Sequence, residues 1–155
     1  MSFNTIQSKS YIRAATLCSK SEQNLFKIKN KLLRWGLSNE ETISVLERLK
    51  EEKFIDEKRY AESFVRDKFK FNKWGKTKIA CQLRFEQIPE DLINSSISII
   101  NKKEYRCTLL KLIEDKNNSI KEPDKYKRQA KLFRFAQSKG FESEITYSVI
   151  KDVLK

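Results

Sequence analysis

The fold can be predicted first from a segment near the middle of the chain: Ile55-Asp56-Glu57-Lys58-Arg59-Tyr60-Ala61-Glu62-Ser63-Phe64-Val65. The Asp56 carboxylate can cap the first turn of a helix, and Glu57 places negative charge where the helix dipole is positive. Apolar side chains then recur at i, i+1, i+4 and i+5, which is one face of a 3.6-residue helix. The segment is therefore predicted to be a capped amphipathic helix with an apolar face formed by Tyr60, Ala61, Phe64 and Val65.

The composition favours helices and a polyanionic partner. The chain has 155 residues, of which 39% are hydrophobic, enough for one domain or several small helical units. Only 3 Gly and 2 Pro occur, too few for the turns of a sandwich or barrel, so we expect an all-α protein. The chain carries 33 Lys and Arg against 21 Asp and Glu, a net charge of +12. Such a field attracts nucleic acid, an acidic protein surface or an anionic membrane.

The sequence lacks the patterns that mark most catalytic and metal sites. There is no histidine, which removes the commonest general base and the commonest zinc ligand. The three cysteines, Cys18, Cys81 and Cys107, form no C-x-x-C pair and are expected to be buried reduced thiols. No phosphate-binding glycine loop is present. We therefore expect no enzymatic activity, no bound metal and no cofactor.

The sequence gives no sign of a membrane-spanning or secreted protein. No apolar run approaches the roughly 18 residues that a membrane-spanning helix needs. Residues 1–7 lack the basic start and the long apolar run of a secretory signal. The expectation is a cytoplasmic protein that does not contact a membrane.

Three similar turns recur along the chain, at Gly36, Gln87 and Gly140. Each follows a basic helical segment, and the offsets between them are 51 and 53 residues by subtraction. The two glycines suit the left-handed position that ends a helix, whereas Gln87 carries a small strain if it adopts the same conformation. A period near 50 residues indicates tandem repeats. In each repeat a large apolar residue follows the turn: Leu37, Ile88 or Phe141.

Further helices flank each turn. After the first turn, Ser38 and Glu41 form a capping box, and after the second, Pro89 occupies the start of the next helix. Upstream of each basic segment lies another helical segment, so each repeat is expected to contain three helices. These leading helices are expected near residues 9–18, 57–71 and 102–115.

The predicted architecture is an elongated tandem array of three three-helix, helix-turn-helix-like repeats. The one clear internal loop is expected at residues 115–123, where polar residues and a proline gather. The predicted parts are an N-terminal tail at 1–8 and repeats at 9–54, 55–101 and 102–155.

Positive charge is concentrated in the early helices of each repeat, and blocks of this kind along an extended stack would form a basic stripe. The densest patch, residues 66–78, interleaves cations with Phe69, Phe71 and Trp74. Cations can neutralise phosphates, and exposed aromatic rings can stack on bases. Phe69 is expected to lie in the core, and Trp74 suits either role. The helix start at 74–76 is expected to offer free backbone N–H groups to an anion.

The candidate binding residues are the cations of this patch and of the corresponding helix in the third repeat. Lys127, Lys131 and Arg134 are spaced i, i+4 and i+7, so they share one helix face. Tyr126, beside them in the sequence, is expected to be a packing residue. The full set predicted to bind is Arg59, Arg66, Lys68, Lys70, Lys73, Trp74, Lys76, Lys78, Arg84, Lys127, Arg128, Lys131 and Arg134.

Three passages resemble the RecX family, the regulators of the bacterial recombinase RecA. Residues 55–65 resemble its signature of aliphatic-Asp-acidic-x-Arg-aromatic-Ala-x-x-aromatic-Val. Residues 74–79 resemble its Gly-x-x-[Arg/Lys]-[Ile] helix start, and residues 133–141 its Arg-Phe-Leu-x-x-Arg-Gly-Phe passage. The order of parts is similar from about residue 10 to the end. The chain departs from the family pattern at Gln87, Ala136 and Lys139, and by one extra residue between Gly36 and Ile43.

This resemblance implies an elongated, curved protein of tandem three-helix units. It implies binding in the helical groove of the filament that RecA forms on single-stranded DNA, and inhibition of RecA's ATPase, strand-exchange and coprotease activities. The implied partners are the RecA filament and single-stranded DNA, with double-stranded DNA left open, and we expect a monomer. The candidate cations would then face DNA or acidic residues of RecA.

Two other classes of function stay open from the residues alone. One is a DNA-binding protein of the transcription-regulator type, although no recognition helix rich in Arg, Asn and Gln lies beside a dimerisation segment. The other is a helical-repeat adaptor that binds only protein. The salt dependence of binding to bare DNA would separate them, because a steep slope favours the first and no slope favours the second.

Overall fold

The computed structural model describes residues 2–155, and within that range it contains nine α-helices and no β-strand. The prediction of an all-α protein is confirmed. Met1, the first residue of the predicted tail, lies outside the described residues. The helices are α1 (Thr5–Lys20), α2 (Leu25–Arg34), α3 (Asn39–Glu51), α4 (Glu57–Lys70), α5 (Lys76–Phe85), α6 (Glu90–Ile97), α7 (Lys102–Ser119), α8 (Lys125–Lys139) and α9 (Ser143–Val153).

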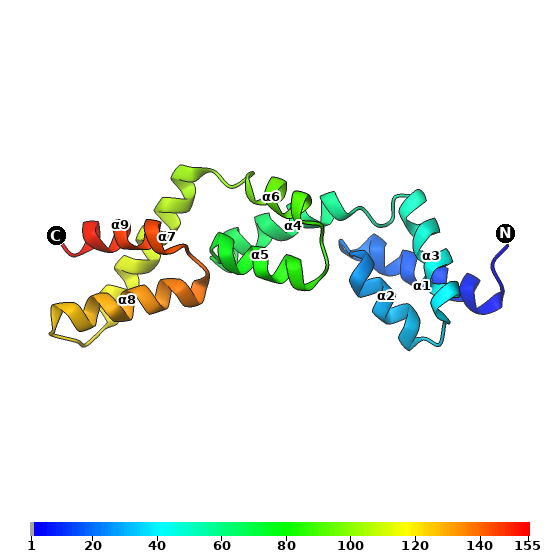
Figure 1. The fold of residues 1–155 in the computed structure, drawn as a ribbon, viewed down its shortest axis with the longest axis horizontal. Helices are drawn as coiled ribbons and strands as arrows, with labels where there is room; N and C mark the ends of the chain where they lie inside the picture. Colours follow the sequence, from blue (N-terminus) through cyan, green and yellow to red (C-terminus); the bar gives the residue numbers. More distant parts are fainter. Residues whose placement is uncertain (1) are drawn as a thin grey trace.

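The helices form three groups that follow one another along a single long axis (Figure 1). Unit 1 contains α1–α3, unit 2 contains α4–α6 and unit 3 contains α7–α9, and the two termini lie at opposite ends. The extensive helix–helix contacts lie inside a unit, such as those of α7 with α9 and of α4 with α6. The predicted elongated array of three-helix repeats is confirmed, whereas the residue boundaries of the repeats remain a prediction.

Side-chain caps fix where several helices begin. The Ser38 hydroxyl accepts a hydrogen bond from the Glu41 N–H at 3.2 Å, and the Glu41 carboxylate accepts one from the Ser38 N–H at 2.8 Å. This is the predicted capping box of α3. The Asp56 carboxylate accepts from the Arg59 N–H at 3.0 Å, as predicted for the start of α4. Pro89 is the residue just before the first turn of α6.

The three predicted turns share one backbone conformation. The dihedral φ is 99° at Gly36, 61° at Gln87 and 93° at Gly140, so the glutamine occupies the left-handed region that glycine favours. Aligned on these turns, a position in unit 3 corresponds to the position 53 residues earlier in unit 2 and 104 residues earlier in unit 1. The same register matches buried positions in the three units, for example Leu132, Ile79 and Ile28.

Two helices are longer than predicted. Helix α1 begins at Thr5 rather than near residue 9, because the Asn4 side chain caps it there. Helix α7 continues to Ser119, so the loop predicted at 115–123 is confined to 120–124.

All three cysteines are free, but Cys81 and Cys107 are exposed, so the expectation of three buried thiols was wrong. Both lie on helix faces that point away from the cores. None of the helices in residues 2–155 combines the length and the apolar character that a bilayer crossing requires.

The molecule has two separate hydrophobic cores. The first lies wholly within unit 1 and includes Ile28, Val45 and Leu49. The second runs continuously through the other two units, since Tyr60 of unit 2 belongs to the same cluster as Phe141 of unit 3. Units 2 and 3 therefore form one packed body, while unit 1 has a core of its own.

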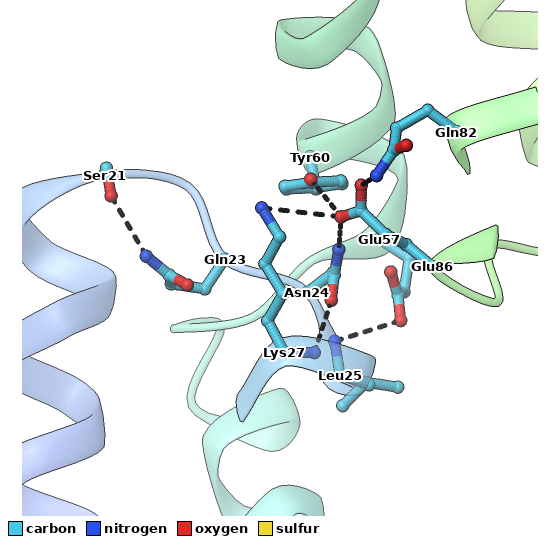
Figure 2. Close-up of polar contacts among 9 residues, drawn as sticks. All are labelled: Ser21, Gln23, Asn24, Leu25, Lys27, Glu57, Tyr60, Gln82 and Glu86. Atoms are coloured by element: carbon cyan, nitrogen blue, oxygen red, sulfur yellow. Dashed lines mark hydrogen bonds and ion pairs between the residues drawn. The ribbon is translucent and has the colours of Figure 1, made fainter. Parts of the chain in front are cut away.

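Unit 1 meets unit 2 through a buried polar joint, drawn in Figure 2. The Glu86 carboxylate, whose residue is 3% exposed, accepts hydrogen bonds from the Asn24 amide at 2.7 Å and from the Tyr60 hydroxyl at 2.5 Å. The Gln82 amide donates to its other oxygen at 2.8 Å, and the Lys27 ammonium lies 3.5 Å away. Because Asn24 and Lys27 belong to unit 1, this one carboxylate ties the two units together.

The joint fixes which of its groups carry protons. Burial alone would raise the pKa of Glu86, but the hydrogen bonds from Tyr60, Gln82 and Asn24 and the charge of Lys27 outweigh it and hold that pKa below its usual range. The pKa of Tyr60 is raised, because burial and the neighbouring carboxylate both disfavour a phenolate. At neutral pH Glu86 is therefore an ionised acceptor and Tyr60 a neutral donor.

Candidate nucleic-acid interface

Five of the predicted lysines gather where α4 ends and α5 begins. The chain reverses there within residues 71–75, and φ is 57° at Lys73, which turns the backbone sharply. None of the five forms an ion pair with a carboxylate within the described part of the chain, residues 2–155. We call this group the central lysine cluster, and its members are Lys68, Lys70, Lys73, Lys76 and Lys78.

Two members of the cluster contact the ring of Trp74. The ammonium nitrogen of Lys78 is 4.5 Å from the centre of the indole ring, and that of Lys68 is 4.9 Å from it. The ring of Phe64 packs edge-on against the same indole at 6.3 Å between centroids. Trp74 is half-buried, so it anchors the turn on the core and holds the two lysines by cation–π attraction. Phe69 also packs against this core, as predicted.

The backbone N–H groups at the start of α5 are occupied, so the prediction that they are free for an anion was wrong. The N–H of Gly75 donates to the Lys139 carbonyl at 2.7 Å, and that of Thr77 donates to the Gly140 carbonyl at 3.0 Å. The N–H of Lys76 donates to a tyrosine hydroxyl at 2.9 Å. Unit 3 docks on this helix start, so an anion at the cluster would meet lysine side chains instead.

The docking of unit 3 brings the end of α8 against the central lysine cluster. A Cβ atom on Gly75 would lie 2.3 Å from the carbonyl carbon of Gly140, and one on Gly140 would lie 2.3 Å from the Cβ of Lys78. The Lys139 ammonium donates to the Asn72 carbonyl at 3.1 Å. The position of the cluster is therefore fixed by unit 3 as well as by unit 2.

The predicted arginines of unit 2 are engaged with carboxylates. Arg59 pairs with Glu22 of unit 1 at 2.7 Å, and Arg84 pairs with Glu90 through two contacts of 2.7 and 3.0 Å. Arg66 forms a looser pair within α4 at 3.7 Å. Exposed pairs of this kind contribute about 0–1 kcal/mol, so a phosphate can displace the carboxylate. These three residues therefore differ from the unpaired lysines of the cluster.

The four predicted residues of α8 lie in different surroundings. The Arg128 guanidinium donates to backbone carbonyl oxygens of residues 117–122 at 2.6 to 3.3 Å and so braces the loop before α8. Lys131 pairs with a glutamate of the same loop at 3.3 Å. Within residues 2–155, Lys127 and Arg134 form no ion pair, and both are exposed. Of the four, these two have the freest charges.

The central lysine cluster and the α8 residues meet at one end only. The Lys78 ammonium approaches the Ser138 carbonyl at 3.5 Å, where α8 ends. Lys127 lies twelve residues before Lys139, which at 1.5 Å per residue is roughly 18 Å along the helix. The central lysine cluster therefore lies close to the C-terminal end of α8, whereas Lys127 lies near the opposite end of that helix.

An open groove of about 780 Å³ between α8 and α9 exposes aromatic residues that were not predicted as a site. Tyr126 is 79% exposed at this groove, so the expectation that it packs was wrong. It lies in the first turn of α8, before the buried stretch of that helix. Tyr147 of α9 is 61% exposed and stacks on Phe133 at 4.5 Å between centroids. The sequence signal that could have indicated this groove is the placement of Tyr126 and Phe133 next to cations on α8.

The chain matches two models of one family. The model described as "RecX, second three-helix domain" matches residues 56–97, and "RecX, third three-helix domain" matches residues 104–150. These ranges coincide with the helices of units 2 and 3.

Two curated relatives carry the name "Regulatory protein RecX". One, from Clostridium botulinum (strain Eklund 17B / Type B), is 36% identical over 130 residues, which is 83% of this chain and 58% of the relative. The other, from Clostridium perfringens (strain SM101 / Type A), is 31% identical over 144 residues, which is 92% of this chain and 66% of the relative. The chain thus spans less than two thirds of the length of these relatives.

Two solved structures have the same fold. The crystal structure of RecX from Lactobacillus salivarius superposes with a TM-score of 0.86 at 21% identity and covers 96% of both chains. A crystal structure of regulatory protein RecX gives the same TM-score at 25% identity and covers 95% of this chain and 72% of the other. The family models match residues 56–97 and 104–150, and the relatives and solved structures agree with most of the chain, so the chain belongs to the RecX family.

Proposed function

We propose that this protein binds the filament of RecA on single-stranded DNA and inhibits the ATPase, strand-exchange and coprotease activities of RecA. Membership of the RecX family, whose curated members are named regulatory proteins, is the observation that carries the proposal. The signature-like segment at residues 55–65 contains the Asp56 cap and the first nine residues of α4. The proposal includes a cytoplasmic, non-enzymatic monomer.

The shape of the molecule supports an extended polymer as the partner. The three units lie in a row along one long axis (Figure 1). Units 2 and 3 share one hydrophobic core, so the helices that carry their cations keep a fixed spacing. A fixed spacing favours a partner with regularly repeated charges, because several contacts then form without further ordering of the chain.

The charge distribution supports nucleic acid or acidic protein as the surface that is bound. Each phosphate that a cation neutralises releases counterions and adds about 0.7 to the salt dependence on single strands. We propose that the central lysine cluster makes the first contacts, followed by Lys127 and Arg134, because these side chains have no carboxylate partner to displace. Arg59, Arg66, Arg84 and Lys131 would contact the filament only by exchanging partners, and Arg128 would act by positioning the loop before α8.

The decisive experiment measures the ATPase rate of RecA from the same organism on single-stranded DNA while this protein is added. Inhibition at an equimolar or lower ratio supports the proposal, and unchanged hydrolysis at equimolar and higher ratios would refute it. Added bare single-stranded DNA provides the control. If the inhibition disappears in proportion to the added DNA, the protein only sequesters DNA, as the DNA-binding alternative requires. Inhibition that persists places the protein on the filament.

A further inference from the structure

The groove between α8 and α9 presents aromatic rings to solvent from both of its walls. Tyr126 and Phe133 are two turns apart on the same face of α8, and Tyr147 projects from α9 and stacks on Phe133 with an angle of 18° between the ring planes. Both tyrosines are mostly exposed, although aromatic rings normally bury large apolar areas. The groove volume of about 780 Å³ lies within the range of small-ligand and cofactor sites.

Three cations surround these rings, and no carboxylate lines the groove. Lys125 and Arg134 line it from α8 and Lys151 from α9. Across the described residues 2–155, none of the three takes part in an ion pair. The groove therefore combines a stacked aromatic surface with unneutralised positive charge, which together suit a ligand that has both a flat ring and a phosphate.

The repeat architecture provides an internal comparison for this groove. In the register set by the turns, the positions of Phe133, Tyr147 and Lys151 hold Ala80, Asn94 and Ser98 in unit 2. In unit 1 they hold Lys29, Ile43 and Glu47. Neither unit has an aromatic ring at these positions, and unit 1 has a carboxylate. The combination in unit 3 is therefore not required by the three-helix fold.

We propose that this groove binds an unpaired base of single-stranded nucleic acid. The base stacks on the exposed side of Tyr147, whose ring already lies on Phe133, or on Tyr126, and Lys125, Arg134 and Lys151 hold the flanking phosphates. Base–aromatic stacking tolerates any base, because every base has a π face. An acidic peptide could pair its carboxylates with the three cations, but it has no flat base that would stack on the aromatic rings. The inference rests on the proposed function, since single-stranded DNA is a component of the filament.

The test compares two fluorescently labelled oligonucleotides of about 12 nucleotides, a length within the site sizes of single-strand-binding domains. One is oligothymidylate, and the other has the same backbone with abasic sites. Binding to the full chain is measured by fluorescence anisotropy at low salt. The key variant is Tyr147→Leu, which removes the aromatic ring and keeps its bulk. Tyr147→Phe retains the ring, and Ile43→Ala is the control at the equivalent exposed position of unit 1.

We expect the parent protein to bind oligothymidylate at least about fivefold more tightly than the abasic strand, the weak end of base–aromatic stacking. Tyr147→Leu should lose most of this preference without weaker binding of the abasic strand, while Tyr147→Phe and Ile43→Ala keep it. Lys151→Glu should weaken the binding of both strands, and Lys9→Glu should not. Tyr126→Leu, at the most exposed ring, serves as the second variant if Tyr147→Leu lowers the melting temperature.

The inference is overturned if Tyr147→Leu and Tyr126→Leu discriminate between the two strands as the parent does. It is also overturned if they weaken binding to the RecA filament while oligothymidylate binding stays unchanged, because the groove then contacts protein. The RecA ATPase is measured with the same preparations. Inhibition by the parent together with a failed oligonucleotide test rejects only the groove, whereas absence of inhibition rejects the proposed function whatever the oligonucleotides show.

Discussion

The backbones of Gly75 and Gly140 touch, with the start of α5 in unit 2 seated directly on the turn between α8 and α9 in unit 3. A Cβ atom added to Gly75 would approach the carbonyl oxygen of Gly140 to 2.3 Å. Side chains cannot separate the two segments, so backbone hydrogen bonds join them directly. This contact sets the relative orientation of the central lysine cluster and α8.

Replacement of Gly75 by alanine should therefore break the contact of units 2 and 3. The φ of −78° at Gly75 suits alanine, so the whole effect comes from the clash with backbone atoms, which cannot rotate away. We expect Gly75→Ala to lower the free energy of unfolding by about 3 kcal/mol, the upper part of the range for overpacked sites. Urea denaturation followed by circular dichroism measures this loss.

Gly36→Ala is the matched control for that prediction. Its φ of 99° is strained for alanine, but the nearest atom to an added Cβ is the Ile6 Cδ1 at 3.8 Å, an ordinary contact. The expected loss is about 1 kcal/mol, from backbone conformation alone. Equal losses for the two variants would show that the contact between units 2 and 3 is looser than the structure indicates.

Acidification should weaken the joint between units 1 and 2. The pKa of Glu86 in the folded protein lies below its unfolded value, so its contribution to stability is complete above the unfolded pKa, near 4.3, and is lost as the pH falls through the folded pKa. Glu86→Gln should cost about 1–2 kcal/mol at pH 7, and the difference from the parent should shrink below about pH 4. Thermal unfolding at several pH values measures both.

The exposed Glu144 provides the comparison for this titration. Glu144→Gln should leave the free energy of unfolding at pH 7 within about 0.5 kcal/mol of the parent, as is usual for surface positions. If Glu86→Gln and Glu144→Gln behave alike between pH 3 and pH 7, the buried carboxylate does not hold the two units together.

Reversal of three lysines of the central cluster should weaken filament binding without unfolding the protein. Lys70, Lys73 and Lys78 are exposed, and none forms an ion pair within residues 2–155. Changing all three to glutamate should reduce the affinity for the RecA–DNA filament at least about tenfold at low salt and lower the salt slope by roughly 2 if each meets a phosphate. Co-sedimentation with filaments at several salt concentrations measures both quantities.

A triple variant with the same change in net charge controls for general electrostatic attraction. Lys9, Lys20 and Lys29 are exposed lysines of unit 1 outside the predicted site. Their reversal should lower the affinity much less than reversal of the cluster. The cluster has no special role if the two triple variants bind equally well.

We expect Arg128 to stabilise the loop before α8 and to contribute little to the binding of a partner. Its guanidinium donates to Asn117, Ile120 and Glu122, and these bonds are lost in Arg128→Ala. Loss of bonds from a charged donor to half-buried acceptors should cost about 2–3 kcal/mol and speed proteolysis at 120–124. Arg134→Ala is the paired variant, and it should weaken filament binding with little change in stability. The opposite pattern would make Arg128 the binding residue.

Helix positions could be predicted where the deciding contacts are local. The caps at Ser38 and Asp56 and the left-handed turn at Gln87 depend on residues within a few positions of each other, and the structure has all three. The end of α7 was mispredicted because Asn117 is a poor helix former in isolation. Its carbonyl and side-chain oxygens both accept from Arg128, a contact across the loop that local propensity does not contain.

The site could be predicted in composition but not in detail. The clustering of cations identified the lysines near Trp74. It could not show that Arg59 is paired while these lysines are not, because the partner of Arg59 is Glu22, which lies 37 residues away in the sequence. The open groove was missed because Tyr126 and Tyr147 sit on different helices, and only the packing of α8 against α9 leaves their rings exposed.

The division into two hydrophobic cores has a consequence for the order in which the protein forms during synthesis. The core of unit 1 is complete once Ile55 has left the ribosome, because every buried residue in it precedes α4. The core that units 2 and 3 share is complete only once Phe141 and Val149 have been synthesised. At about 5–20 residues per second, the finished sequence of unit 2 precedes its partner by roughly 2–10 s. During that interval the nascent chain exposes an apolar surface to chaperones, and unit 1 does not.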